Sequence, residues 1–152
     1  MNGSALITGA ANRIGKEMAL GLAEKGINIV VHYMSSEKEA EEVVEVARTY
    51  GVRAASVKAN LLNDNEVKEL IPKAASLIGE QLNILVNNAS IFEYDNIDTV
   101  STKSWDRHIG SNLKAPLFLI QEFAKFVPEG VLDINGENMP QGNIINIVDQ
   151  RV

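Results

Sequence analysis

Short continuous runs of apolar residues alternate along the chain with longer stretches in which apolar residues recur every three or four positions. The continuous runs are rich in β-branched residues, which is typical of strands buried on both faces; they cover residues 5–7, 27–33, 53–59, 82–88 and 143–148. The periodic stretches have the spacing of amphipathic helices; they cover residues 13–25, 37–50, 65–77, 104–109 and 112–127. Residues 128–142 are expected to form a long polar loop.

Strict alternation of strand and helix predicts an α/β fold, a Rossmann-type doubly wound parallel sheet with right-handed crossovers. The expected strand order is 3-2-1-4-5. The chain of 152 residues suits a single domain, residues 1–152, that buries about two-thirds of its unfolded surface. In this order the apolar run 143–148 lies at an edge of the sheet with unpaired N–H and C=O groups. We therefore expect later strands to be absent, and the chain to be the N-terminal part of a larger protein or a chain whose remainder lies elsewhere.

Apolar spacing and capping residues predict which helix positions are buried and where helices begin. In the first helix the apolar positions are Ile14, Met18, Leu20 and Leu22. In the last helix the candidates for burial are Leu117, Phe118, Ile120, Phe123 and Ala124. Ser36 precedes an acidic first turn and is a candidate N-cap of the second helix.

Composition and charge narrow the possible functions. Hydrophobic residues make up 45% of the chain and charged residues 22%, which is typical of a soluble globular protein. The net charge of −6 argues against binding to nucleic acid or to an anionic membrane surface. No apolar run approaches the roughly 20 residues that span a bilayer, and the N-terminus does not resemble a signal peptide. The chain has no cysteine, which excludes disulfides and leads us to expect a cytoplasmic protein. With no cysteine and only two histidines, a metal site has little support.

The stretch 4–15, SALITGAANRIG, has the pattern of a strand, a glycine turn and the start of a helix. Amides at a helix start lack internal partners and the helix dipole there favours an anion, so such a unit can hold a pyrophosphate. Gly9 permits the tight turn, and Gly15 permits close approach of helix and phosphate. A Walker-type phosphate loop is excluded because Lys16 is followed by Glu17 and not by a hydroxyl residue. A glycine turn that binds no ligand is the alternative.

The end of the second predicted strand, residues 32–36, bears on cofactor choice. An NAD site usually places Asp or Glu here to bind the ribose 2′-hydroxyl, but no carboxylate precedes Glu37. A 2′-phosphate would meet no repelling charge and can bond to Arg13 and to serine hydroxyls, so NADP(H) is the favoured cofactor. Alternatively, His32 is an ordinary buried strand histidine and Ser36 only a helix cap. The candidate cofactor contacts in this stretch are His32, Tyr33, Ser35 and Ser36.

Residues 8–15, TGAANRIG, resemble the cofactor loop TGxxxGxG of the short-chain dehydrogenase/reductase family. The family's middle glycine is replaced by Arg13, as in the pteridine reductases and their bacterial dihydrofolate- and dihydromonapterin-reductase relatives. The resemblance implies that the loop binds NADP(H). The residues it assigns to the cofactor are Thr8, Gly9, Arg13, Ile14 and Gly15.

Two further strand ends match the family pattern. Residues 60–61 follow the third strand, where the family usually has Asp and an apolar residue against the adenine. Residues 87–90, NNAS, resemble the family's NNAG element, with Ser90 in place of glycine as in pteridine reductases. An NN pair that only satisfies backbone groups is the alternative. The cofactor contacts that the resemblance implies here are Asn60, Leu61, Asn88, Ala89 and Ser90.

The resemblance also assigns substrate and catalytic residues. In pteridine reductases NNAS continues into an aromatic, here Phe92, which implies a pterin ring stacked between Phe92 and the nicotinamide; alternatively Phe92 fills an edge of the core. Asn112 matches a family Asn in the helix below the active site, which bends that helix and holds a water of the proton relay. Alternatively, Asn112 is an ordinary N-cap. Asp149 stands where pteridine reductases have Asp, and it is expected to position a pterin and assist proton delivery, unless it only faces solvent.

The resemblance carried by these motifs implies an NADPH-dependent short-chain reductase that transfers hydride to a pteridine or dihydrofolate-like substrate. The family's YxxxK pair is absent, because none of the three tyrosines is followed four residues later by Lys, so the chain alone is expected to be inactive. A carbonyl or 3-oxoacyl reductase of the same family is one alternative, and a non-catalytic NADP(H)-binding sensor module is another. The expected partner is a small-molecule substrate, and the full-length form is expected to be a homo-oligomer.

Overall fold

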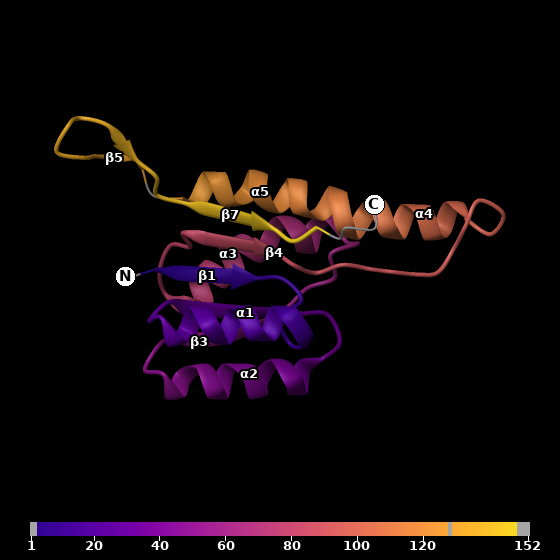
Figure 1. Cartoon of the computed structure of the whole chain (residues 1–152), viewed down its shortest axis with the longest axis horizontal. Helices are drawn as coiled ribbons and strands as arrows, with labels where there is room; N and C mark the ends of the chain where they lie inside the picture. The colour runs from indigo at the N-terminus through magenta and orange to yellow at the C-terminus, as the bar shows by residue number, and fades with distance from the viewer. Residues whose placement is uncertain (1–2, 128, 149–152) are drawn as a thin grey trace.

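The computed structural model describes residues 3–127 and 129–148 and contains a sheet of five parallel strands (Figure 1). The order across the sheet is β3-β2-β1-β4-β7, so the predicted order is confirmed with β7 as the fifth strand of the sheet. Every predicted strand end lies within two residues of the observed one. The strands are β1 (Ser4–Ile7), β2 (Asn28–Tyr33), β3 (Ala54–Lys58), β4 (Ile84–Asn87) and β7 (Asn143–Asn146).

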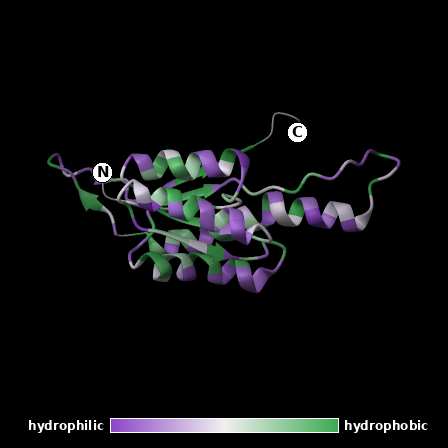
Figure 2. Ribbon diagram, turned by 90° about the horizontal axis from the view of Figure 1, so that it is seen from below, coloured by the Kyte–Doolittle hydropathy of each residue, from purple (hydrophilic) through white to green (hydrophobic). Residues whose placement is uncertain are grey.

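Helices cover both faces of the sheet, and successive strand residues enter opposite cores. On β1, Ile7 packs in the core formed with α1 and α2, whereas Leu6 packs in the core formed with α3 and α5. Figure 2 shows the strands as an apolar layer between helices that carry both apolar and polar faces. The helices are α1 (Arg13–Glu24), α2 (Glu37–Thr49), α3 (Asp64–Ile78), α4 (Thr102–Ile109) and α5 (Ala115–Phe126), with the π-helix η1 (Gly110–Lys114) between α4 and α5.

The prediction of buried helix positions was only partly correct. Phe123 is buried as predicted, but Leu117 and Ala124 are exposed, and the buried Leu119 was not predicted. The reason is that α5 is apolar around most of its circumference, so spacing alone does not select the face that packs on the sheet. In α1, Ile14 is 63% exposed, because it lies at the start of the helix beyond the edge of the core.

The segment predicted to be a polar loop contains a short antiparallel hairpin. Its strands are β5 (Val131–Leu132) and β6 (Asn138–Met139), and both are exposed. Asp133 Oδ1 accepts hydrogen bonds from the amides of Asn135 and Glu137, each at 2.8 Å, and Gly136 supplies a positive φ of 79° in the turn. Strands of two residues are too short to give a period-2 pattern, so the sequence did not predict them. Both views show this hairpin and the segment before α4 at opposite ends of the molecule (Figures 1 and 2).

Strand β7 forms one edge of the sheet and pairs with β4. Its apolar side chains and those just after it remain partly in solvent, since Ile144, Ile145 and Ile147 are 38%, 40% and 43% exposed. The prediction of an apolar edge strand is therefore confirmed. Within residues 3–127 and 129–148, no helix is long and apolar enough to cross a membrane.

Glu80 lies at the end of the sheet where the strands begin, and it links the starts of β1, β2 and β3. Its carboxylate accepts hydrogen bonds from Ser4 Oγ, from Asn28 Nδ2 at 2.6 Å, and from the Arg53 guanidinium. Arg53 also donates to the Ile78 carbonyl at 2.6 Å, which connects the end of α3 to the same cluster. Burial raises the pKa of Glu80, but these hydrogen bonds and the charge of Arg53 outweigh burial, and the pKa lies below its ordinary value of 4.5.

We expect Glu80→Gln to lower the free energy of unfolding at pH 7 by about 1–2 kcal/mol, because charge-assisted bonds at a partly exposed site are lost. Since the folded state lowers the pKa of Glu80, its contribution is complete above the ordinary value of 4.5 and is lost as the pH falls below it. Urea unfolding at several pH values measures both effects. Glu69→Gln, which removes an exposed pair with Lys73, is the matched control and should change stability by less than about 0.5 kcal/mol. Equal effects of the two substitutions would contradict the role given to Glu80.

Candidate functional site

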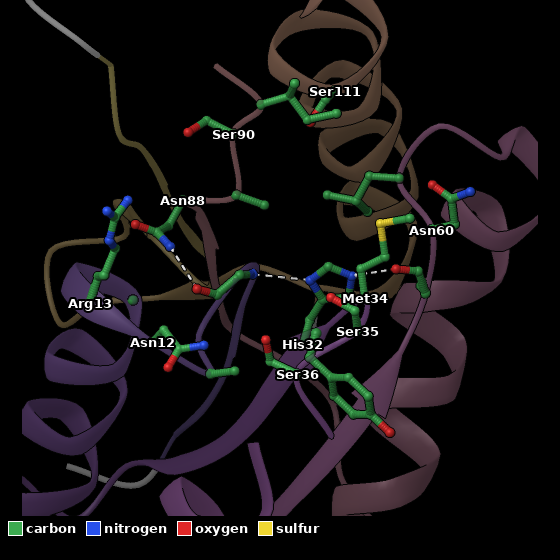
Figure 3. Close-up of a pocket in the computed structure, with 18 of the residues that line it drawn as sticks. Asn12, Arg13, His32, Met34, Ser35, Ser36, Asn60, Asn88, Ser90 and Ser111 are labelled. Atoms are coloured by element: carbon green, nitrogen blue, oxygen red, sulfur yellow. Dashed lines mark hydrogen bonds between the residues drawn. The ribbon is translucent and has the colours of Figure 1, made fainter. Parts of the chain in front are cut away.

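An open cavity of about 400 Å³ lies at the carboxyl ends of β1, β2, β3 and β4 (Figure 3). Ligands of doubly wound sheets bind at this edge, where the strand order reverses on either side of the first strand. Among the described residues that line the cavity, Arg13 is the one formally charged side chain and there is no carboxylate. The lining residues are Gly9, Ala11, Asn12, Arg13, Ile14, Gly15, His32, Tyr33, Met34, Ser35, Ser36, Ala59, Asn60, Leu61, Leu62, Asn88, Ala89, Ser90, Ile91 and Ser111.

The first turn of α1 borders the cavity, since Asn12, Arg13, Ile14 and Gly15 line it. Asn12 occupies the N-cap position but, within the described structure, makes no side-chain cap hydrogen bond, and the first turn contains no acidic residue. By contrast, α3 is capped by Asn63 and α4 by Ser101, both through side-chain oxygens. Because the first amides of a helix have no intrahelical acceptor, the start of α1 is suited to an anionic ligand.

Gly9 and Gly15 allow the close packing of this turn. Gly9 has a φ of 63°, and a Cβ there would lie 3.0 Å from the Ala89 Cα. A Cβ on Gly15 would lie 2.4 Å from the Gly9 carbonyl oxygen and 2.5 Å from Asn88 Nδ2. Both positions therefore require glycine, for backbone conformation at Gly9 and for space at Gly15.

Arg13 has a positive φ of 52°, which is unusual for a residue with a side chain. The resemblance placed Arg13 where the family has glycine, and the left-handed backbone explains why glycine suits this position. Figure 3 shows Arg13 on the side of the cavity where Asn88 lies, with Asn12 between Arg13 and Ser36. Arg13 and Ser36 thus lie on different sides of Asn12 in this view, and the bond from Arg13 to a 2′-phosphate stays a prediction.

The end of β2 contributes His32, Tyr33, Ser35 and Ser36 to the cavity, as predicted. His32 is 2% exposed; burial lowers its pKa to about 4, and its hydrogen bond to the Ala59 carbonyl opposes this only in part. The imidazole is therefore neutral at pH 7. Ser36 occupies the N-cap position of α2, as predicted, but within the described structure its side chain makes no cap hydrogen bond, so the hydroxyl borders the cavity without that role.

The neighbouring ends of β3 and β4 also reach the cavity. Asn60 and Leu61 line it as predicted, although Asn60 Oδ1 already accepts a bond from the Leu62 amide at 3.0 Å. Asn88 Nδ2 donates to the carbonyls of Thr8 at 2.8 Å and Gly9 at 3.2 Å. Asn88 thereby fixes the β1–α1 turn against β4, so the NN pair does more than satisfy its own strand.

Thr8 differs from its predicted role, because it is buried and does not line the cavity. Its hydroxyl oxygen accepts bonds from the amides of Asn88 at 2.9 Å and Ala89 at 3.0 Å, and it donates to the Val86 carbonyl at 3.3 Å. A hydroxyl that is engaged on three sides has a structural function. Thr8 holds the loop from behind while its neighbours face the cavity.

Asn112 lies within η1 and fixes the segment that follows β4. Its Oδ1 accepts from the Ile91 amide at 2.8 Å and its Nδ2 donates to the Ile91 carbonyl at 2.9 Å. The N-cap alternative is wrong, because residues on both sides of Asn112 are helical. The adjacent Ser111, which is buried and lines the cavity, was not predicted, since it reaches the site only through the packing of this helix.

Phe92 is not among the residues that line the cavity. It is 66% exposed and contacts Tyr94 edge-to-face with ring centroids 4.9 Å apart. The alternative in which Phe92 fills a core edge is therefore wrong, and its predicted stacking on a substrate stays a prediction. Asp149 lies outside the described residues. Within those residues, no group of three or more His, Cys, Asp or Glu side chains is arranged to hold a metal.

Comparison with known proteins identifies a family whose model matches this chain and several proteins of similar sequence. The model of the short chain dehydrogenase family matches residues 4–150. The 3-oxoacyl-[acyl-carrier-protein] reductase FabG of Staphylococcus epidermidis is 41% identical over 122 residues, which are 80% of this chain and 50% of that protein. Thus the chain spans about half the length of the curated relatives it matches.

Two solved structures extend the comparison. FolM alternative dihydrofolate reductase 1 from Brucella suis, in complex with NADP, has a TM-score of 0.85 and 34% identity over 97% of this chain and 57% of that one. A short chain dehydrogenase from Burkholderia cenocepacia J2315, also in complex with NADP, has a TM-score of 0.82 and 29% identity over 93% of this chain and 53% of that one.

Proposed function

Because the chain belongs to the short-chain dehydrogenase family, we propose that its cavity binds NADP(H) and that the protein acts as an NADPH-dependent reductase. The observation that carries this proposal is the pair of helix starts at the cavity. Within the described structure, α1 and α2 both begin beside it without side-chain caps, whereas α3 and α4 are capped by their own residues. Helix starts without side-chain caps suit a ligand with several phosphate groups, and no carboxylate is among the described residues that line the cavity, although Glu37 and Glu39 lie in the first turn of α2.

The two phosphate-bearing parts of the cofactor are assigned to different sides of the cavity. The diphosphate fits the start of α1, where Gly15 lets the turn at Gly9 and Ala10 pack directly against the helix and where Arg13 supplies a positive charge. The 2′-phosphate fits the start of α2, where Ser35 and Ser36 supply hydroxyl groups. Asn60 and Leu61 then lie on the adenine side, and Ala89 and Ser90 on the nicotinamide side.

A pteridine or dihydrofolate-like substrate is the first candidate. Support comes from Arg13 and Ser90, which depart from the common family pattern in the direction of pteridine reductases, and from the FolM relative at 34% identity. Bound NADPH would supply a hydride to a C=N carbon, and a protein group or water would supply the proton. We assign Asn112 and Asp149 to the catalytic side of the site and Phe92 to substrate stacking.

A 3-oxoacyl or other carbonyl substrate is the second candidate, supported by the 41% identity to FabG. The natural gene product that contains this sequence separates the two candidates. Its oxidation of NADPH is measured with a dihydropterin and with an acetoacetyl thioester in parallel. Turnover of the dihydropterin alone supports the first candidate, and turnover of the thioester alone replaces it with the second. NADPH binding without turnover of either substrate would favour a sensor function.

Replacing Ser36 with Asp tests the 2′-phosphate position. The added carboxylate repels a phosphate but not a hydroxyl, so NADPH affinity should fall by about 10–100-fold, or ~1.4–2.7 kcal/mol, while NADH affinity stays nearly constant. Asp is also a good N-cap, so the variant should fold normally. Isothermal titration calorimetry with both dinucleotides measures the ratio.

Ser101→Asp is the matched control, because it adds the same charge at the N-cap of α4, away from the cavity. It should leave both affinities unchanged. An unchanged preference in Ser36→Asp would show that the 2′-phosphate does not bind at the start of α2.

A further inference from the structure

Three hydrogen bonds connect the carboxyl ends of four neighbouring strands across the cavity (Figure 3). Asn88 Nδ2 after β4 donates to the Gly9 carbonyl at 3.2 Å, and the Gly9 amide after β1 donates to His32 Nδ1 at 3.0 Å. His32 Nε2, at the end of β2, lies 3.0 Å from the carbonyl of Ala59, which follows β3. We call these three contacts the strand-end hydrogen bonds; His32 makes two of them.

The two partners of His32 fix its protonation. The Gly9 amide can only donate, so Nδ1 must accept, and the Ala59 carbonyl can only accept, so Nε2 must carry the proton. Only the neutral tautomer protonated at Nε2 satisfies both bonds. Burial and the lowered pKa are consistent with a neutral ring at pH 7.

His32 also determines which amides remain for a ligand. The Gly9 amide is bound to its ring, and the Ala10 amide is bound to its backbone carbonyl at 3.0 Å. These first two amides of the turn therefore point toward β2. The anion must be met further along, by the amides at the start of α1, and their position follows from how the turn is held.

We propose that His32 is a positioning residue, which does not bind the diphosphate itself but holds Gly9 so that the start of α1 is in place to bind it. This inference rests on the proposed NADP(H) site. The backbone of Gly9 lies close to Ala89, and the hydrogen bond from its amide to His32 Nδ1 fixes where the turn lies relative to β2. Without the acceptor on His32, the partly buried Gly9 amide loses its hydrogen-bond partner, and we expect the binding-competent conformation of the turn to be less populated.

Three substitutions separate the two bonds of His32. In His32→Asn, the side-chain oxygen can take the place of Nδ1 and accept from Gly9, while the contact with Ala59 is lost. In His32→Gln, the amide nitrogen reaches the place of Nε2 and donates to Ala59, while the acceptor for Gly9 is lost. His32→Phe keeps an aromatic ring at this position but removes both bonds.

The affinity of each full-chain variant for NADPH is measured by calorimetry, together with its affinity for 2′-AMP, which lacks the diphosphate. We expect His32→Asn to bind NADPH within about threefold of wild type, and His32→Gln and His32→Phe to lose about tenfold or more. The affinity of His32→Gln for 2′-AMP should be unchanged, which a general loss of stability would not produce. Equal NADPH affinities in the Asn and Gln variants, whether both retained or both lost, would overturn the proposal.

Nitrogen NMR of the unliganded wild type gives a test that needs neither binding nor a variant. We expect the Nε2-protonated tautomer of His32 at pH 7 and slow hydrogen exchange at the Gly9 amide. The other tautomer, or a Gly9 amide that exchanges as fast as an exposed loop, would overturn the inference. If wild type shows the expected tautomer but does not bind NADPH, the proposed cofactor is wrong and the His32 contact with Gly9 stands.

Discussion

Gly15→Ala is expected to lower NADPH affinity by at least about 100-fold, or ~2.7 kcal/mol. A Cβ at this position would lie 2.4 Å from the Gly9 carbonyl oxygen and 2.9 Å from the Ala10 Cα, both backbone atoms of the turn that faces the cavity. The turn must move, and the hydrogen bond from Asn88 to Gly9 would be disrupted, since Asn88 Nδ2 lies only 2.5 Å from the same Cβ. Overpacking of this kind should also lower the free energy of unfolding by about 1–3 kcal/mol.

Gly21→Ala is the matched control in the same helix. A Cβ there would meet no atom within 4 Å among the described residues, so the substitution should leave NADPH affinity unchanged. It should raise stability by about 0.5–1 kcal/mol, because alanine is the better helix former. Calorimetric titration and urea unfolding of both variants provide the comparison. Normal NADPH binding by Gly15→Ala would contradict the assignment of the diphosphate to the start of α1.

Arg13→Gly should change stability and affinity in opposite directions. Glycine adopts the observed φ of 52° without strain, so the free energy of unfolding should rise by up to about 1 kcal/mol. NADPH affinity should fall by about 10–100-fold, because a charge-assisted bond to phosphate is worth ~1.5–3 kcal/mol. Such a result would mean that the strained backbone at Arg13 serves ligand binding and lowers folding stability.

Arg13→Ala separates the two effects, because it removes the charge and keeps a side chain in the left-handed conformation. We expect it to lose the same affinity as Arg13→Gly without the gain in stability. Thermal unfolding and calorimetry on the two variants give both quantities. An Arg13→Gly variant that binds NADPH as tightly as wild type would exclude the guanidinium from the phosphate site.

Much of the fold and the location of the site could be predicted from the sequence. Continuous apolar runs such as 27–33 are informative because only strands buried on both faces need them, and strand order followed from their alternation with helices. Strand ends were equally informative. In a parallel sheet their carboxyl ends meet at one edge, so residues as distant as Gly9 and Ser90 were predicted to lie near the same cavity, and they do.

The features that the sequence did not predict depend on packing and backbone geometry. The motif placed Thr8 among the cofactor contacts, but its hydroxyl is buried and engaged by β4. The positive φ of Arg13 depends on the path of the turn, which residue types alone do not specify. Ser111 joins the site only because the helical segment around Asn112 packs behind the loop after β4.

The most direct test of the account is the equilibrium binding of NADPH and NADH to this chain, measured by isothermal titration calorimetry under one set of conditions. A cavity with open helix starts, an arginine and no lining carboxylate should bind NADPH, and at least about tenfold more tightly than NADH. Failure to bind NADPH, or equal or tighter binding of NADH, would contradict the assignment of this cavity to an NADP(H) site.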